Sequence, residues 1–525
     1  MTERPLLMQT NRILLIALAF AEGTAVMMAE LSAAKMLAPV YGSSLYVWGT
    51  IVGITLVSLT AGYYLGGSLS RRGNRQTAVL WFMLVAAVLV AAMPHLAHPL
   101  LPVFVELGTI PAILLLTAVL LSPALLLLGA TSPLIISLLA DRVEDSGRAA
   151  GTVYGVSTVG GIIGTFAAGF LLIPWLGLTL TTFLAGLLLI ALPMPVLLRQ
   201  RRFSALVLPL IAVALLTLKP TPEDHPDVQV VYESEGLLGQ LKVIDFSYSL
   251  PNEPRRTDRI LFVNRTAQTW IRRDSGEPVW DYMPYIQSVS SLQPEGSRAL
   301  LLGLGGGTIA LQLQEIGFTV DSVELDRRIA QVGKEHFGLE HSGDIFIDDG
   351  RHFLRATDRR YDVIIFDVFQ AEVPPAHLLT LETFRDLHER LTPNGFVIVN
   401  YSGYLHGSTG RGARSIYRTM TEAIDHVEII PTSDDEDTSN NLFIASRQPL
   451  DLSRPRMPLV LNGRAHRLTD LVLDPAQVAL DDAIILVDNR PVLEKLNLEA
   501  AERWRQTYYE YFTIPFREKG VPIFD

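Results

Sequence analysis

The chain has 525 residues, of which 49% are hydrophobic and only 18% are charged, and its mean hydropathy is +0.30. This composition excludes a disordered or fibrous protein and argues against one ordinary soluble domain. The absence of cysteine excludes a disulfide scaffold, a thiolate zinc site and a cysteine nucleophile.

The net charge of −11 is divided unequally along the chain. Residues 1–218 hold 11 Lys or Arg and 7 Asp or Glu, which gives +4. The remaining residues hold 32 basic and 47 acidic side chains, which gives −15. We therefore expect two physically different halves, and the acidity of the second half argues against nucleic acid as a partner.

Long uncharged stretches in the first half predict an α-helical membrane domain at 1–218, with the lipid bilayer as its partner. A spanning helix needs about 20 predominantly apolar residues. The stretch 149–198 is long enough for two spans, separated at Pro174–Gly177. With a shorter apolar run at 203–218 the total is about seven helices, and the six longer ones are expected at 13–38, 44–69, 77–93, 109–140, 152–172 and 178–198.

Arginine positions predict the orientation of these helices, because positively charged short loops stay in the cytoplasm. Arginines precede the first helix and follow the second, fourth and sixth, whereas the loops at 95–108 and 174–177 have neither Lys nor Arg. The N-terminus is therefore expected on the cytoplasmic side of the cell (inner) membrane. The arginines are Arg4, Arg12, Arg71, Arg72, Arg75, Arg142, Arg148, Arg199, Arg201 and Arg202.

The run 203–218 decides on which side of the membrane the second half lies. Its sixteen residues reach about 24 Å, and the hydrocarbon core is about 30 Å thick. If the run crosses, the second half lies outside the cytoplasm, and if it lies along the interface, the second half lies inside. Crossing is the favoured expectation, because bilayers tolerate short spans.

Two carboxylates inside the first helix are candidates for a function of the membrane half. Glu22 and Glu30 are eight residues apart and share a helix face. An ionisable residue within a membrane span is by default a functional hypothesis. The alternative for Glu30, and for Lys35, is that they lie near the helix end and simply reach polar surroundings.

The second half is predicted to be an α/β domain behind a proline-rich linker at 219–227. Residues 228–297 are expected to form a small β-rich region, with turns at Gly236–Gly239 and Pro251–Pro254. Residues 298–525 begin with a strand at 299–302, a glycine-rich loop at 303–307, a helix at 309–316 and a strand at 320–324.

Acidic residues after the predicted strands indicate a nucleoside-binding crevice. Glu324 ends the strand that follows the loop, where a carboxylate can accept both hydroxyls of a ribose. Asp367 follows a buried strand at 363–366, and the carboxyl ends of parallel strands meet at one edge of the sheet. The loop lacks the Lys and Ser/Thr of a P-loop, which argues against triphosphate hydrolysis. The group also includes Asp326, Asp348, Asp349 and Gly350.

A series of motifs in a fixed order extends this pattern over residues 230–500. They are Gly236-Leu-Leu-Gly-Gln240, Glu277-Pro-Val-Trp280-Asp281-Tyr282-Met283, the Gly303–Gly307 loop, Val323-Glu324-Leu325-Asp326, Asp349-Gly350-Arg351, Tyr361-Asp362-Val-Ile-Ile-Phe366-Asp367, Leu391-Thr-Pro393-Asn-Gly395 and Asp488-Asn-Arg-Pro491-Val492. In this order the region resembles the spermidine synthase (polyamine aminopropyltransferase) branch of the Rossmann-like class I S-adenosylmethionine-dependent transferase fold. The first half is similar to the membrane region fused to such domains in many bacterial proteins, which is distantly related to half of a major facilitator transporter.

The resemblance implies a co-substrate and roles for particular residues. The co-substrate is decarboxylated S-adenosylmethionine or S-adenosylmethionine itself, and no metal is expected. Asp367 would polarise or deprotonate the attacking amine. Substrate binding would fall on Gln240, Trp280, Asp281 and Gln370, and co-substrate binding on Gly303, Gly305, Gly307, Glu324, Asp326, Asp348, Asp349 and Gly350.

The sequence departs from the family pattern where the amine should bind. The usual loop Gly-Gly-Gly-Asp-Gly is here Gly303-Leu-Gly-Gly-Gly307, without the acid. The usual Asp-x-x-Asp, whose second acid binds the diamine, is here Asp367-Val-Phe-Gln370. Trp280-Asp281 stand where the family has Tyr followed by Gln or His. Since a buried ammonium without an anionic partner is unfavourable, these changes weigh against a diamine.

Three functions are compatible with these features. The first is a membrane-bound aminopropyltransferase-like enzyme that acts on an amine such as putrescine. The second is an S-adenosylmethionine-dependent transferase that acts on a lipid or another membrane-delivered acceptor. The third is a non-catalytic polyamine transporter or sensor, which would need a homodimer because six or seven spans are about half of a typical facilitator.

Overall fold

The computed structural model describes residues 4–41, 45–71, 74–105, 107–140, 142–217, 226–236, 238–249, 254–264, 266–368, 375–433, 435–436, 440–508, 510 and 516. The chain divides into two compact units, one built mainly from the N-terminal helices and one mainly from the C-terminal sheets. Most of the linker expected at 219–227 lies outside the described residues.

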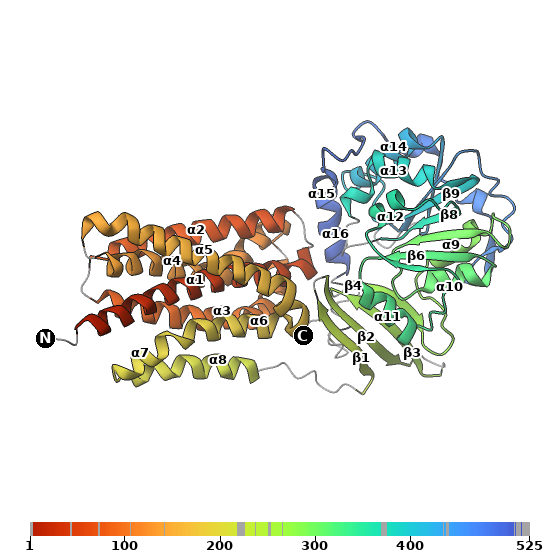
Figure 1. Cartoon of the computed structure of the whole chain (residues 1–525). Coiled ribbons are helices and arrows are strands. Elements are labelled where there is room, and N and C mark those ends of the chain that lie inside the picture. Colours follow the sequence, from red (N-terminus) through yellow and green to blue (C-terminus); the bar gives the residue numbers. More distant parts are fainter. Residues whose placement is uncertain are drawn as a thin grey trace. The chain divides into compact units, whose positions relative to one another are not determined.

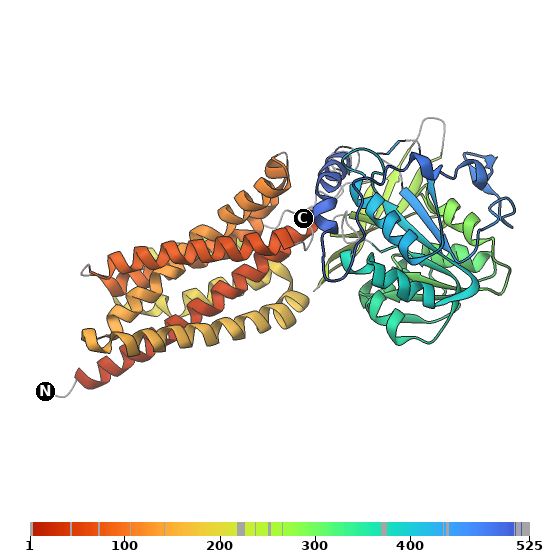
Figure 2. The same ribbon diagram turned by 90° about the horizontal axis from the view of Figure 1, so that it is seen from above.

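The N-terminal unit consists of helices that run side by side (Figures 1 and 2). Five described segments are long and apolar enough to cross a membrane, which fits the predicted membrane domain. The last of these, Val143–Arg199, holds two of the predicted spans. The helices are α1 (Arg4–Tyr41), α2 (Leu45–Leu69), α3 (Arg75–Val105), α4 (Thr109–Leu139), α5 (Ser146–Phe166), α6 (Ile173–Ala191), α7 (Pro193–Arg199) and α8 (Val207–Thr217).

Two boundaries differ from the sequence-based expectation. Helix α3 continues to Val105, so the loop expected at 95–108 is much shorter, because no charged residue interrupts the chain between Arg75 and Glu106. Between α5 and α6 the helix continues through a π-helical turn at Ala167–Leu172 and is interrupted at Gly177, whose φ is +78°. A positive φ favours glycine, and this break lies inside the predicted separator.

Glycines allow close packing of the helix backbones in this unit. A Cβ on Gly66 of α2 would lie 2.3 Å from the Ala130 carbonyl oxygen of α4. A Cβ on Gly160 of α5 would lie 2.3 Å from the Phe20 carbonyl oxygen of α1. Small residues at such contacts are typical of membrane helices. By contrast, Gly155 faces open space, so only some of the glycines at 151–169 serve packing.

The C-terminal unit contains a seven-stranded mixed sheet with the strand order β10-β11-β9-β8-β5-β6-β7. The pairs among β5 to β9 are parallel, and β11 pairs antiparallel with both β9 and β10. This is the predicted Rossmann-like arrangement. The strands are β5 (Arg298–Leu302), β6 (Thr319–Glu324), β7 (Ile345–Ile347), β8 (Tyr361–Phe366), β9 (Leu391–Ser402), β10 (His426–Pro431) and β11 (Asn440–Ser446).

Helices cover both faces of this sheet and bury a core on each (Figure 1). One core contains side chains of α9 (Met283–Ser290), α10 (Thr308–Glu315) and α11 (Arg327–His336). The other contains side chains of α12 (Gly350–Ala356), α13 (Leu381–Glu389) and α14 (Arg411–Ala423). Strands β5 and β8 are buried on both sides, which explains their continuous apolar sequences.

The predicted β-rich region is a separate four-stranded sheet of order β1-β2-β3-β4. Pairing is antiparallel between β2 and β3 and between β3 and β4. Its strands are β1 (Val228–Gly236), β2 (Gly239–Tyr248), β3 (Arg256–Val263) and β4 (Thr266–Arg272). Near the end of the chain, α15 (Leu493–Leu496) is followed by α16 (Leu498–Tyr508), whose Tyr508 hydroxyl accepts the Ala267 N–H of β4 at 2.9 Å.

Candidate active site

The glycine-rich loop connects β5 to α10 in a conformation that requires glycine. Gly303, Gly305 and Gly307 have φ values of +87°, +53° and +90°, which side chains disfavour. A Cβ on Gly303 would lie 2.2 Å from the Asp367 carbonyl oxygen. The loop and the end of β8 are therefore in backbone contact, as the predicted crevice requires.

Glu324 at the end of β6 holds the next part of this loop. One of its carboxylate oxygens accepts the Leu304 N–H at 3.1 Å and the other accepts the Asp326 N–H at 2.9 Å. Burial raises the pKa of Glu324, although these backbone donors lower it. A carboxylate has about four acceptor positions, so Glu324 can still accept a ribose hydroxyl beside the loop.

Thr269 of β4 connects the smaller sheet to the loop. Its hydroxyl oxygen accepts the Gly306 N–H at 2.8 Å. Its methyl carbon would lie 2.7 Å from a Cβ on Gly306. The β-rich region therefore supplies one wall of the loop and is part of the same site.

Asp367 is positioned by the sheet. It directly follows β8, and its N–H donates to the Leu302 carbonyl oxygen of β5 at 2.9 Å. Burial raises the pKa of its carboxyl group to about 6, although hydrogen bonds from Asn400 and Tyr282 lower it. A carboxylate with such a pKa is suited to accept a proton near neutral pH.

A chain of two asparagines fixes the orientation of this carboxylate. The Asn400 side-chain amide of β9 donates to Asp367 Oδ1 at 2.7 Å. The Asn440 side-chain amide of β11 donates to Asn400 Oδ1 at 2.8 Å. Since the Asn400 oxygen is occupied by Asn440, its NH₂ group is the part directed at Asp367.

Tyr282, immediately before α9, makes the other side-chain hydrogen bond to Asp367. Burial and the neighbouring Asp367 charge raise the pKa of Tyr282 well above its usual range. The phenol therefore stays protonated and donates to the carboxylate.

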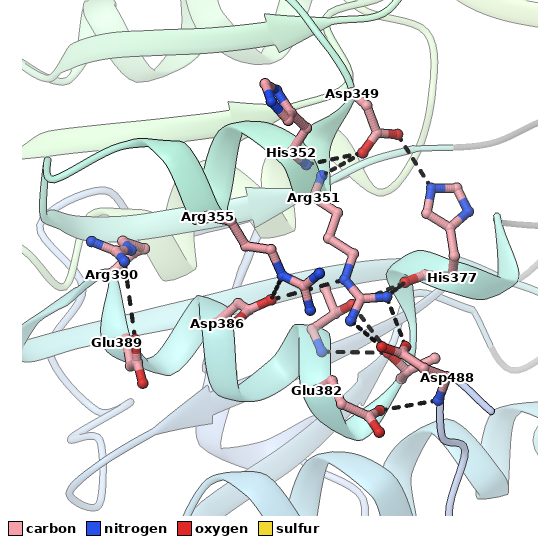
Figure 3. Close-up of polar contacts among 12 residues, drawn as sticks. Asp349, Arg351, His352, Arg355, His377, Glu382, Asp386, Glu389, Arg390 and Asp488 are labelled. Carbon is pink, nitrogen blue, oxygen red and sulfur yellow. Dashed lines mark hydrogen bonds and ion pairs between the residues drawn. The ribbon is translucent and has the colours of Figure 1, made fainter.

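Of the predicted Asp348-Asp349-Gly350 segment, Gly350 is the first residue of α12 and Asp349 caps the helix, and Figure 3 shows the contacts of Asp349. Asp349 accepts the N–H groups of Arg351 and His352 and also contacts His377 Nε2 at 3.2 Å. Burial alone would raise the pKa of Asp349. Hydrogen bonds from the His352 amide and from His377 lower it by more, so the pKa lies below its usual value. Asp348 accepts the Asp349 N–H and contacts the His352 ring.

Arg351 joins two motifs that are far apart in the sequence (Figure 3). Its guanidinium forms a bidentate ion pair with Asp488, with one N–O distance of 2.7 Å. Asp488 also accepts the Thr380 hydroxyl at 2.8 Å. The Asp349-Gly350-Arg351 and Asp488-Asn-Arg-Pro491 segments therefore form one polar cluster beside α13.

The remaining predicted site residues have mixed surroundings. Asp326 caps α11 and pairs with Arg328 at 2.6 Å, so its carboxylate already has a structural role. Trp280 packs edge to face on Trp270 of β4. Asp281 is exposed and Gln240 is half-buried in β2. Gln370 lies outside the described residues. Contact of these residues with a ligand stays a prediction.

Sequence reasoning missed four residues that the structure brings to the site, namely Tyr282, Asn400, Thr269 and His377. A signal existed for Asn400, because a polar residue near the carboxyl end of a buried strand beside β8 is positioned like Asp367. Tyr282 lies inside the Glu277–Met283 motif, but the motif gives no sign of its hydrogen bond to Asp367. Nothing local marked Thr269 or His377.

Comparison with known proteins identifies the central part of this unit. Residues 286–406 match the spermine/spermidine synthase domain. The chain is 27% identical over 232 residues to a probable polyamine aminopropyl transferase of Bifidobacterium longum, covering 44% of this chain and 49% of that protein. It is 28% identical over 129 residues to a polyamine aminopropyltransferase of Vibrio vulnificus, covering 23% and 43%.

Other similar proteins include a methyltransferase and a solved structure. An N-terminal histidine N-methyltransferase of Emericella nidulans is 30% identical over 142 residues, covering 26% of this chain and 24% of that protein. A probable spermidine synthase structure from Corynebacterium glutamicum has a TM-score of 0.39 and 22% identity, covering 47% of this chain and 93% of that one. The chain spans about half or less of the length of these curated relatives. The similarity to the spermine/spermidine synthase domain lies in residues 286–406, the part of the chain that holds the glycine-rich loop and Asp367.

Proposed function

We propose that the chain is a membrane-attached transferase of the aminopropyltransferase type, which transfers the aminopropyl group of decarboxylated S-adenosylmethionine to an amine such as putrescine. The observation that carries the proposal is Asp367, a carboxylate with a pKa of about 6 held in backbone contact with the glycine-rich loop. The family of residues 286–406 supports the reaction type.

In the proposed reaction the amine nitrogen of the acceptor attacks the aminopropyl carbon bound to the sulfonium sulfur. The carbon–nitrogen bond forms as the carbon–sulfur bond breaks, and methylthioadenosine leaves with the bonding electrons. The nitrogen loses a proton, which the ionised Asp367 accepts. Tyr282 and Asn400 donate hydrogen bonds to this carboxylate and orient it, and fixed alignment of the two reactants supplies much of the rate enhancement.

Methyl transfer from S-adenosylmethionine to a membrane-delivered acceptor is the second candidate. It is favoured by the histidine N-methyltransferase relative and by Trp280, which packs on Trp270 where the family has Tyr. To separate the two, the purified chain is incubated with each donor, with putrescine or with extracted lipid as acceptor. Methylthioadenosine release with an amine supports the first candidate, and adenosylhomocysteine release supports the second.

The pH dependence of turnover tests whether Asn400 and Asn440 orient the Asp367 carboxylate. An ionised Asp367 is needed as proton acceptor, so activity should fall as the pH drops below about 6. In Asn440→Asp the new carboxylate can accept the Asn400 NH₂ group and turn the Asn400 oxygen toward Asp367. A hydrogen bond to a charged group contributes about 1.5–3 kcal/mol, so we expect the acidic limb of kcat/KM to move up by about one pH unit.

Asn394→Asp is the matched control for this shift. Asn394 is exposed near the opposite end of β9, and its replacement adds the same charge without touching Asn400. We expect its acidic limb to stay within about 0.2 pH units of that of the unaltered chain at moderate salt, because exposed charges are screened within about 10 Å. An unmoved limb in Asn440→Asp would show that Asn440 does not orient the carboxylate.

We propose that the first half spans the cell membrane. The N-terminus and the C-terminal unit, called the catalytic unit from here on, would both lie in the cytoplasm. With the break at Gly177 as a turn, the five candidate segments would provide six crossings. The 3₁₀ turn Phe203–Leu206 and α8 (Val207–Thr217) together reach about 22 Å along the helix axis, which is short of a core of about 30 Å. We therefore propose that the run 203–218 does not cross, which is the alternative to the crossing expected from the sequence.

A single cysteine tests this topology, because the chain has none of its own. In Ser408→Cys, at an exposed position of the catalytic unit, an impermeant thiol reagent should label the protein only after cell lysis. Labelling of intact cells would place the catalytic unit outside.

A further inference from the structure

The N-terminal unit contains a buried carboxylate that the proposed transfer reaction does not use. Glu22 of α1 has 3% of its surface exposed. Glu22 Oε2 accepts hydrogen bonds from the Ser157 hydroxyl of α5 at 2.9 Å and from the Ser132 hydroxyl of α4 at 3.4 Å. Three helices therefore bring three oxygen-bearing side chains together.

Within the described part of the chain, no basic side chain pairs with Glu22; its polar partners there are the two hydroxyl groups. Helix α6 has no ionisable residue, and neither has α4. Of the ionisable groups on the other neighbouring helices, the Tyr63 phenol interacts electrostatically with Glu22. The described groups are Tyr46, Tyr63 and Tyr64 on α2, Arg75 and His95 on α3, and Arg148 and Tyr154 on α5.

A buried negative charge without a positive partner is strongly unfavourable. Hydroxyl groups reduce this penalty but do not supply the missing charge. A cation bound from solution would supply it, and carboxylate and hydroxyl oxygens are ligands that suit a hard cation or a proton.

The packing around Glu22 limits the size of that cation. A Cβ on the adjacent Gly23 would lie 2.0 Å from the Ser157 carbonyl oxygen, so the backbones of α1 and α5 touch beside the carboxylate. Thr24 also donates to the Gly160 carbonyl oxygen of α5 at 3.0 Å. Contacts this close leave no room for an organic ammonium ion between the two helices.

We propose that Glu22, with Ser132 and Ser157, forms a binding site for a small monovalent cation, a proton or a sodium ion. Binding neutralises Glu22 and stabilises the close packing of α1 against α4 and α5. This assigns to the helical unit a function other than attachment, and it holds whether or not the C-terminal unit transfers an aminopropyl group.

The test measures unfolding of the helical unit in the full-length chain in detergent. Ala29→Cys, at a fully buried position of α1, reports this event through a thiol-reactive dye, since the chain has no other cysteine. Melting is compared with and without Glu22→Gln, which has no charge to neutralise. Glu30→Gln, on the same helix but partly exposed, is the matched control.

A ligand that binds only the folded state raises stability by RT ln(1 + [L]/Kd). If sodium is the ligand, the melting temperature should rise as sodium replaces a large organic cation at constant ionic strength. If a proton is the ligand, the melting temperature should instead fall with rising pH and should not depend on the sodium concentration. Either response should disappear in Glu22→Gln and persist in Glu30→Gln. A response that survives Glu22→Gln, or no response in the reporter chain, would overturn the proposal.

Discussion

Replacement of Asp367 by Asn should reduce kcat by about 10²–10⁴-fold, the usual contribution of a positioned proton acceptor. The amide has nearly the same shape as the carboxylate but cannot accept the proton of the attacking amine. The glycine-rich loop and Glu324 are untouched by the change, so donor affinity measured by calorimetry should stay within about threefold, which corresponds to about 0.7 kcal/mol.

Asp274→Asn is the control for the charge removed by this change. Asp274 is exposed in the turn after β4, and its replacement should leave both turnover and donor binding unaltered. If Asp367→Asn kept its turnover within tenfold of the unaltered chain, Asp367 would not be the proton acceptor. If it lost donor binding instead, its role would be structural.

Replacement of Gly303 by Ala should unfold the loop and abolish donor binding. The φ of +87° disfavours any side chain, and the added Cβ would lie 2.2 Å from the Asp367 carbonyl oxygen. The backbone conformation contributes about 1–3 kcal/mol of strain, and overpacking adds about as much. Thermal denaturation of the catalytic unit should therefore occur at a clearly lower temperature.

Gly276→Ala separates these two effects. Gly276 has a similar φ of +73°, but a Cβ there meets nothing within 4 Å. We expect only the backbone strain in this variant, with donor binding intact. Equal destabilisation by the two replacements would mean that contact between the loop and Asp367 is unimportant for stability.

The elements of the catalytic unit could be predicted from the sequence because each carries a local signal. Buried parallel strands are apolar on both faces, so β5 and β8 were recognisable as uninterrupted runs before Gly303 and Asp367. Parallel strands share one carboxyl edge, which explains why Asp367 was expected beside the loop. The structure places them in backbone contact.

The contacts around Asp367 could not be predicted in the same way. Asn440 reaches Asp367 only through Asn400 on the neighbouring strand, and this depends on the antiparallel pairing of β11 with β9. Thr269 reaches the loop from a separate sheet. Such contacts depend on how strands pair and sheets pack, and residue type gives no signal of them.

In the helical unit, length and apolar composition located the helices, but their packing required the structure. Glu22 and Glu30 share a helix face in the sequence, yet only Glu22 is enclosed by other helices. Gly23, next to Glu22, lets the backbone of α5 approach α1 at this level.

In the proposed reaction the catalytic unit transfers an aminopropyl group to an amine. Its most direct test is mass spectrometry of the products after the purified full-length chain is incubated with decarboxylated S-adenosylmethionine and putrescine. We predict equal amounts of methylthioadenosine and aminopropylated putrescine, with much less of both in Asp367→Asn. If the chain binds the donor but releases no methylthioadenosine, with putrescine or with other primary amines as the acceptor, aminopropyl transfer is contradicted.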